Sequence, residues 1–123
     1  MSHRIIRFGS ALLCLLAASG PAWAHAHLKI SMPSDGEMLN SSPSEIRLDF
    51  TEGLEPAFSG LTITAQSGQP VDVAKPTVSG IEGHELSTST STPLSPGSYT
   101  VQWHVLSKDG HATSGTYHFR VMP

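Results

Sequence analysis

Beyond its first two dozen residues, the chain alternates between apolar and polar positions in short segments, and none of them has helical spacing. In residues 45–50, for example, Ile46, Leu48 and Phe50 fall on one side, which predicts a half-buried strand. The Ser/Thr run at 87–92 fits a loop as well as a strand. The pattern predicts strands at residues 27–32, 45–50, 61–65, 71–73, 84–90, 98–106 and 116–121.

The predicted strands are separated by turn-forming groups of Pro, Gly, Ser and Asp, such as Pro33–Gly36 and Pro93–Gly97. The last two strands carry the strongest apolar face, whereas His104, His118 and Arg120 face outward. Their inward positions are Tyr99, Val101, Trp103, Val105, Tyr117, Phe119 and Val121. Short strands with regular turns over about a hundred residues predict an all-β fold, a single Greek-key β-sandwich of about seven strands.

Residues 1–24 have the organisation of a secretory signal peptide. Arg4 and Arg7 precede the apolar stretch 11–18, and Ala22-Trp23-Ala24 supplies a cleavage site. The apolar stretch is shorter than the roughly 20 residues of a membrane span, so removal is predicted and a membrane anchor is not. Cleavage after Ala24 is favoured, and cleavage before His27 also fits the small-residue pattern.

The predicted mature domain, residues 25–123, is one small domain without internal repeats. It has no cysteine, so core packing must hold it together without disulfides. It keeps five basic and ten acidic residues, a formal charge of −5. This charge argues against nucleic acid or an anionic membrane surface as a partner, and it is compatible with a cation.

Cleavage after Ala24 would make His25 the N-terminal residue, with an amine and an imidazole side by side. Cu(II) prefers a tetragonal set of nitrogen and oxygen ligands, and His111 with Asp109 would complete such a set. On an extended segment these two residues would face the same side. The alternative is that Asp109 only helps its loop to turn and that His111 is an ordinary surface histidine. The spacing does not place the first strand beside this loop.

The motifs together resemble the CopC family of exported copper-binding proteins. The resemblance runs from His25-Ala26-His27-Leu28 through Leu48-Asp49-Phe50 to residues 96–103, Ser107-Lys108-Asp109-Gly110-His111 and Phe119-Arg120-Val121, and is weaker over 64–94. It implies an immunoglobulin-like or cupredoxin-like sandwich in the periplasm. It also implies a Cu(II) site formed by His25, Asp109 and His111.

One departure from that family concerns methionine, because some members have a methionine-rich loop that binds Cu(I) through soft thioethers. Met32, Met38 and Met122 are scattered here, and we expect them to fill gaps in the core or to lie at the chain end. We therefore predict one Cu(II) site and no Cu(I) site.

The other histidines have lesser expected roles. His27 is a candidate supporting residue, or an alternative ligand in a square-planar chelate that begins at His25. His104 and His118, on neighbouring strands, are expected to be solvated, and whether they form a secondary site stays open. His84 is expected in a loop or at a strand edge.

The leading functional hypothesis is a non-enzymatic, monomeric Cu(II) carrier or buffer in copper resistance. It would pass the ion to a partner such as a membrane copper transporter. The alternative is an oxidative copper enzyme with a histidine-brace site, although Asp109 would then occupy the position that O₂ needs. A third possibility is an adhesion module whose histidines are incidental.

Overall fold

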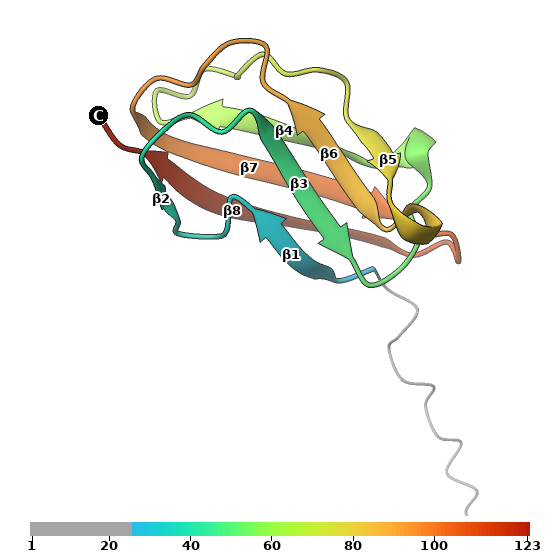
Figure 1. The fold of residues 1–123 in the computed structure, drawn as a ribbon. Helices are drawn as coiled ribbons and strands as arrows, with labels where there is room; N and C mark the ends of the chain where they lie inside the picture. Colours follow the sequence, from blue (N-terminus) through green and yellow to red (C-terminus); the bar gives the residue numbers. More distant parts are fainter. Residues whose placement is uncertain (1–25) are drawn as a thin grey trace, which may run out of the picture.

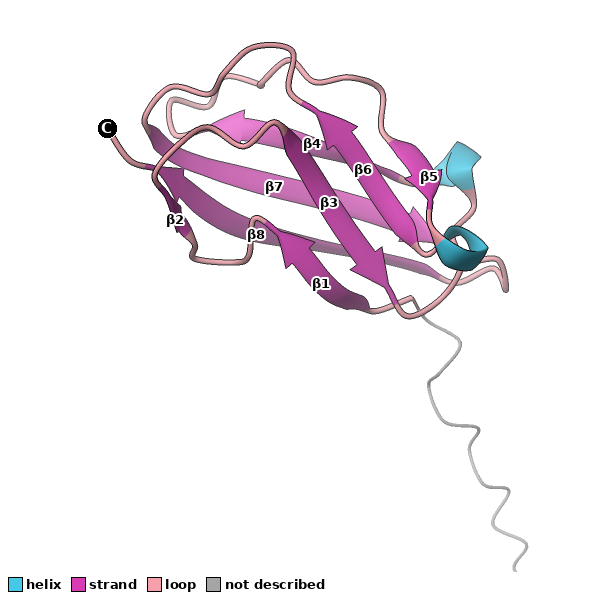
Figure 2. Ribbon diagram, in the orientation of Figure 1, coloured by secondary structure: helices cyan, strands magenta, loops and turns pink. Residues whose placement is uncertain are grey.

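The computed structural model describes residues 26–123, which form two facing β-sheets (Figures 1 and 2). The predicted signal peptide and His25 lie outside the described residues. The described elements, in chain order, are β1 (Leu28–Met32), β2 (Met38–Leu39), β3 (Glu45–Phe50), the 3₁₀ helix η1 (Pro56–Phe58), β4 (Gly60–Ala65), β5 (Thr77–Ser79), the 3₁₀ helix η2 (Ile81–Gly83), β6 (Glu85–Ser89), β7 (Gly97–Leu106) and β8 (Ala112–Val121).

The strand order is β1-β3-β6-β5 in one sheet and β2-β8-β7-β4 in the other. Every neighbouring pair is antiparallel except β2 with β8, which is parallel. The predicted all-β sandwich is confirmed. The strand count differs, because residues 71–73 form no strand, although Val73 makes an isolated bridge with Thr90 and the amide of Val71 donates to Ile63. In contrast, β2 and β5 are strands of two and three residues, too short to show a hydrophobic period.

The core lies between the sheets, and the alternating pattern places it there. Ile46, Leu48 and Phe50 of β3 are all buried, as their period of two predicts. The β7–β8 hairpin pairs continuously from Gly97 with Val121 to Leu106 with Ala112. The buried apolar residues are Ala26, Ile46, Leu48, Phe50, Leu54, Leu61, Ile63, Leu86, Leu94, Tyr99, Val101, Val105, Tyr117, Phe119 and Val121.

Trp103 packs over a glycine on the neighbouring strand. It pairs with Gly115 across the hairpin, and a Cβ added to that glycine would lie 2.5 Å from Cζ2 of the indole. The ring of Phe50 meets the indole edge to face, with centroids 5.1 Å apart. The indole is partly buried and turned inward, as predicted. This orientation requires glycine at position 115, because any side chain there would collide with the ring.

The expectation that the methionines fill the core is wrong. The exposed fractions of Met32, Met38 and Met122 are 56%, 63% and 36%. A register shift between Leu28 and Ile30 in β1 changes the face of the later residues, which places Met32 outward. Met38 lies on an edge strand, and only Met122 is at the chain end as expected.

The start of β1, the end of β3 and the β7–β8 connection lie at one end of the sandwich, opposite the C-terminus (Figure 1). Figure 2 shows both 3₁₀ helices at this same end. Neither of these helices in residues 26–123 is long and apolar enough to cross a membrane.

Candidate metal site

The connection between β7 and β8, Ser107–His111, is a tight turn. The amide of Gly110 donates to the carbonyl oxygen of Ser107 at 2.9 Å, and Gly110 has a φ of 91°, which favours glycine. The amide of Ser107 donates to the carbonyl oxygen of His111 at 2.9 Å. The expected extended geometry for Asp109 and His111 is therefore wrong, because the turn brings them together.

Asp109 and His111 form a side-chain pair on this turn. Oδ1 of Asp109 lies 3.2 Å from Nδ1 of His111. Their side chains are 44% and 45% exposed, so an ion can reach both of them from solvent. A carboxylate oxygen and an imidazole nitrogen at this distance can contribute two ligands to one ion.

The buried hydroxyl of Ser107 lies beneath this pair. It donates a hydrogen bond to Oδ1 of Asp109 and accepts one from the amide of His111 at 3.2 Å. This hydroxyl is the main cause that lowers the pKa of Asp109, with smaller contributions from His111 and an opposing one from desolvation. Asp109 is therefore ionised at neutral pH and carries a negative charge that suits a cation.

The loop that contains Gly53 and Leu54 makes backbone contacts with the turn. The amide of Lys108 donates to the carbonyl oxygen of Gly53 at 3.0 Å, and Leu54 makes a β-bridge with Ser107. The amide of Leu54 in turn donates to the carbonyl oxygen of Gly83 at 2.9 Å. These backbone bonds fix the position of the turn on the sandwich.

The first described residues lie directly beside β8. The hydroxyl of Thr113 donates to the carbonyl oxygen of Ala26 at 2.8 Å, and Ala26 is fully buried. His27 is held through its backbone, since its amide donates to Oγ1 of Thr51 and its carbonyl oxygen accepts from the amide of Thr51, both at 2.9 Å. The first described residue, Ala26, therefore lies beside Thr113, which is two residues after His111.

Within residues 26–123, no group of three or more His, Cys, Asp or Glu side chains could hold a metal ion. Asp109 and His111 are thus a pair that needs further ligands from elsewhere. His25, the predicted source, lies outside the described residues, and it precedes Ala26 directly.

The remaining histidines are dispersed. His104 pairs with Ser114 and His118 with Thr100, so the two rings are four ladder positions apart, about 13 Å along the strands. Both are exposed, as expected, and this separation is too large for one ion. Nε2 of His84 lies 3.7 Å from the carboxylate of Glu82, just before β6.

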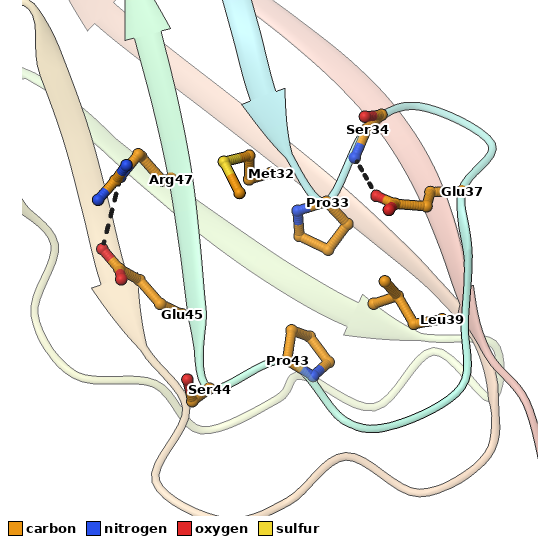
Figure 3. A pocket seen from close by; sticks show the side chains of 9 residues that line it. All are labelled: Met32, Pro33, Ser34, Glu37, Leu39, Pro43, Ser44, Glu45 and Arg47. Atoms are coloured by element: carbon orange, nitrogen blue, oxygen red, sulfur yellow. Dashed lines mark hydrogen bonds and ion pairs between the residues drawn. The ribbon is translucent and has the colours of Figure 1, made fainter.

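A separate pocket of about 440 Å³ opens at the other end of the sandwich (Figure 3). Met32, Pro33, Leu39 and Pro43 supply its apolar surface. The carboxylate of Glu45 lies 3.9 Å from Nε of Arg47 at its rim. This pocket lies away from the Asp109–His111 turn and shares no residue with it.

Sequence reasoning missed the roles of Ser107, Thr113 and Thr51. The role of Ser107 could have been predicted in part, because a serine hydroxyl in a turn commonly forms a hydrogen bond with a nearby residue. The threonine contacts span 87 residues for Thr113 and 24 for Thr51, and no local pattern reports such distances.

The chain matches known proteins over nearly all of the described residues. The CopC domain family matches residues 28–122. The protein YobA of Escherichia coli K12 is 36% identical over 118 residues, 96% of this chain and 95% of YobA. Copper resistance protein C of Xanthomonas campestris pv. juglandis is 38% identical over 109 residues, 85% of each chain. The crystal structure of CopC from Methylosinus trichosporium OB3b has a TM-score of 0.74 and 34% identity, covering 80% of this chain and 95% of that one.

The β-sandwich fold and these matches place the protein in the class of copper-resistance domains, which are not enzymes. The chain belongs to the CopC family. Its members are copper resistance proteins and not enzymes, which removes the histidine-brace oxidase alternative.

Proposed function

We propose that export and cleavage after Ala24 leave His25 as the mature N-terminus, and that residues 25–123 then form one Cu(II)-binding domain in the periplasm. The ligands are the amine and imidazole of His25, the carboxylate of Asp109 and the imidazole of His111. The hydrogen bond from Thr113 to the carbonyl oxygen of Ala26 is the observation that carries this proposal. It fixes the residue after His25 beside the strand that begins at the Asp109–His111 turn, and consecutive Cα atoms are only about 3.8 Å apart.

The donor set suits Cu(II), which favours tetragonal nitrogen and oxygen ligands. An α-amine has an ordinary pKa of about 7.7–8.0, so a metal ion displaces its proton readily near neutral pH. Asp109 is already ionised because its pKa is lowered, and it balances part of the charge of the ion. The set therefore offers three nitrogens and one oxygen.

The contact between Asp109 and His111 also assigns donor atoms. Nδ1 of His111 and Oδ1 of Asp109 lie 3.2 Å apart, a separation that suits two neighbouring ligands of one ion. In this arrangement His111 binds Cu(II) through Nδ1, and Asp109 binds through Oδ1.

The alternative chelate through His27 is less favoured by the geometry. That chelate needs a deprotonated backbone amide at His27, whereas this amide donates to Thr51 in the fold. Its formation would break this bond to Oγ1 of Thr51, one of the two that hold the start of β1. His27 remains a candidate supporting residue near the ion.

The proposed role is copper buffering and transport in copper resistance, in keeping with the name of the relative from Xanthomonas. The domain acts as a monomer and passes its ion to an acceptor, for which we propose a membrane copper transporter. A pull-down from membranes with the copper-loaded domain, compared with a His111→Ala domain, tests this acceptor.

Cu(II) titration of the cleaved protein tests the site. We expect one equivalent to bind with a d–d absorption band and to raise the Tm, because only the native state brings all of the proposed ligands together. Adding a glycine before His25, or changing His111→Ala, should weaken binding at least about 100-fold. His104→Ala is the matched control, an exposed histidine at which binding should not change.

Equal affinity of the extended and native termini would refute the His25 ligand. An intact mass of the exported protein that begins at His27 would refute the cleavage site and the ligand together. Tight stoichiometric Cu(I) binding would refute the prediction of a single Cu(II) site.

A further inference from the structure

Ser107 is the one buried residue of an otherwise exposed turn. It is 1% exposed, whereas the four residues that follow it are exposed. A buried hydroxyl is nearly always hydrogen-bonded, so its partners indicate what it does. Within the described residues, its side chain contacts Asp109 and His111.

The hydroxyl has a single proton, and the contacts determine where it goes. Oδ1 of Asp109 and the carbonyl oxygen of His111 are both within reach as acceptors. A hydrogen bond to a charged carboxylate is stronger than one to a neutral carbonyl, so the proton points to Asp109. The oxygen of the hydroxyl then accepts the amide of His111 at 3.2 Å.

The same carboxylate oxygen also faces Nδ1 of His111. Oδ1 of Asp109 is thus held between the hydroxyl of Ser107 and the imidazole of His111. The 3.2 Å between Oδ1 and Nδ1 suits two neighbouring ligands of one ion, so the hydroxyl of Ser107 bonds directly to the carboxylate oxygen that would bind the ion.

The turn itself does not depend on this hydroxyl. The backbone bonds from Gly110 to Ser107 and from Ser107 to His111 close the turn, and the bridge from Leu54 and the bond from Lys108 to Gly53 fix it. All of these remain possible with alanine at position 107. The hydroxyl therefore acts on the two side chains rather than on the path of the chain.

We infer that Ser107 is a positioning residue for copper binding, which pre-orients the carboxylate of Asp109 and the imidazole of His111 for one ion. This inference rests on the proposed Cu(II) site and adds a residue that acts through the ligands. Residues that hold metal ligands in place typically change affinity 10- to 100-fold when they are removed.

A double-mutant cycle on Cu(II) affinity tests the inference. In the cleaved protein, Ser107→Ala should raise the Kd about 10-fold and shift the d–d band, because the carboxylate loses its fixed orientation. In an Asp109→Ala background the same change should alter the Kd less than about twofold, because its main target is absent. Ser114→Ala, at an exposed serine of β8, is the control and should leave the Kd unchanged.

Amide hydrogen exchange without copper gives a second measurement. Ser107→Ala should speed exchange at His111, which loses its acceptor, and should leave Gly110 protected because the turn persists. Loss of protection at both amides would show that Ser107 is only structural and would overturn the inference. An unchanged Kd in Ser107→Ala, or an equal change in both Asp109 backgrounds, would also overturn it. Failure of the wild-type protein to bind Cu(II) would instead refute the proposed function itself.

Discussion

The hydroxyl of Thr113 donates a hydrogen bond to the carbonyl oxygen of Ala26 across 87 positions of sequence. This contact attaches the first described residue to the strand that leaves the Asp109–His111 turn. Through this contact Thr113 could affect copper binding without being a ligand.

Thr113→Val should therefore weaken Cu(II) binding about three- to tenfold, because the terminus loses a hydrogen bond worth about 0.5–1.5 kcal/mol. Isothermal competition against a Cu(II) chelator measures this change. Thr116→Val, at an exposed threonine on the same strand, should bind as the wild type does. Equal weakening in both variants would mean that the effect is a general loss of β8 stability.

Asp109 predicts a pH dependence of stability in the copper-free protein. Its pKa is lowered in the fold, first by the hydroxyl of Ser107, below the ordinary value of about 3.9 for an unfolded chain. The ionised carboxylate therefore stabilises the fold above that ordinary value, and the contribution is lost as the pH falls through the lowered pKa.

The urea midpoints of wild type and Asp109→Asn, compared from pH 7 to pH 2.5, measure this contribution. The difference should be constant above about pH 5 and should shrink as the solution is acidified below about pH 4. It should be smaller in a Ser107→Ala background. A difference that does not depend on pH would contradict the assignment.

Tyr117 has a buried hydroxyl for which the described residues provide no hydrogen-bond partner. Tyr117→Phe should leave the free energy of unfolding unchanged or raise it by up to about 1 kcal/mol, because the unsatisfied group is removed and the ring is kept. Tyr99→Phe is the opposite case, since the hydroxyl of Tyr99 donates to the carbonyl oxygen of Ser95 at 2.5 Å. That variant should lose about 1 kcal/mol.

Burial, with smaller effects from Asp35 and Glu37, also raises the pKa of Tyr117. A raised pKa means that the stability is fully present below the unfolded value of about 10 and is lost as the pH rises above it. Tyr117→Phe should therefore lose less stability than the wild type between about pH 9 and 11. Urea unfolding over this range measures the difference, and parallel loss in both proteins would contradict it.

Gly115→Ala should destabilise the protein by about 1–3 kcal/mol, because the new methyl would lie 2.5 Å from the indole of Trp103 and must displace it. Trp103 is the only tryptophan in residues 25–123, so its fluorescence reports the displacement directly. We expect a shift in the emission maximum of the folded protein together with a lower urea midpoint. An unchanged emission maximum would show that the indole does not lie over Gly115.

The sequence predicts the strands in which apolar and polar residues alternate over several positions. β3, β7 and β8 lie where the alternation places them, and their inward residues are buried except Trp103, which is partly buried. β8 is longer than predicted, because Gly115 and the small polar residues before it hide the pattern, although they pair fully with β7. The outward turn of Met32 could not be predicted, since it depends on one register shift between strands.

For the site, the sequence identifies Asp109 and His111 and the residue types that suit copper, but not the way they meet. The turn at Gly110 brings them together, where an extended segment was expected. The contact of Ala26 with Thr113 is a property of the tertiary fold, so composition and spacing alone could not provide it. Whether His25 completes the site stays a prediction.

The ten continuous pairs of the β7–β8 hairpin give the two halves of the proposed site unequal stiffness. The Asp109–His111 turn closes a fully paired ladder and is fixed from below by Gly53 and Leu54, so it opens only at a large cost in free energy. His25 is joined to the fold through Ala26, which accepts a bond from Thr113, and His27, which makes two bonds with Thr51. Ligand exchange should therefore start at the terminus, so an acceptor would take the ion by displacing His25 first while the turn keeps hold of it. The domain would then set the rate of copper release by how readily its chain end detaches.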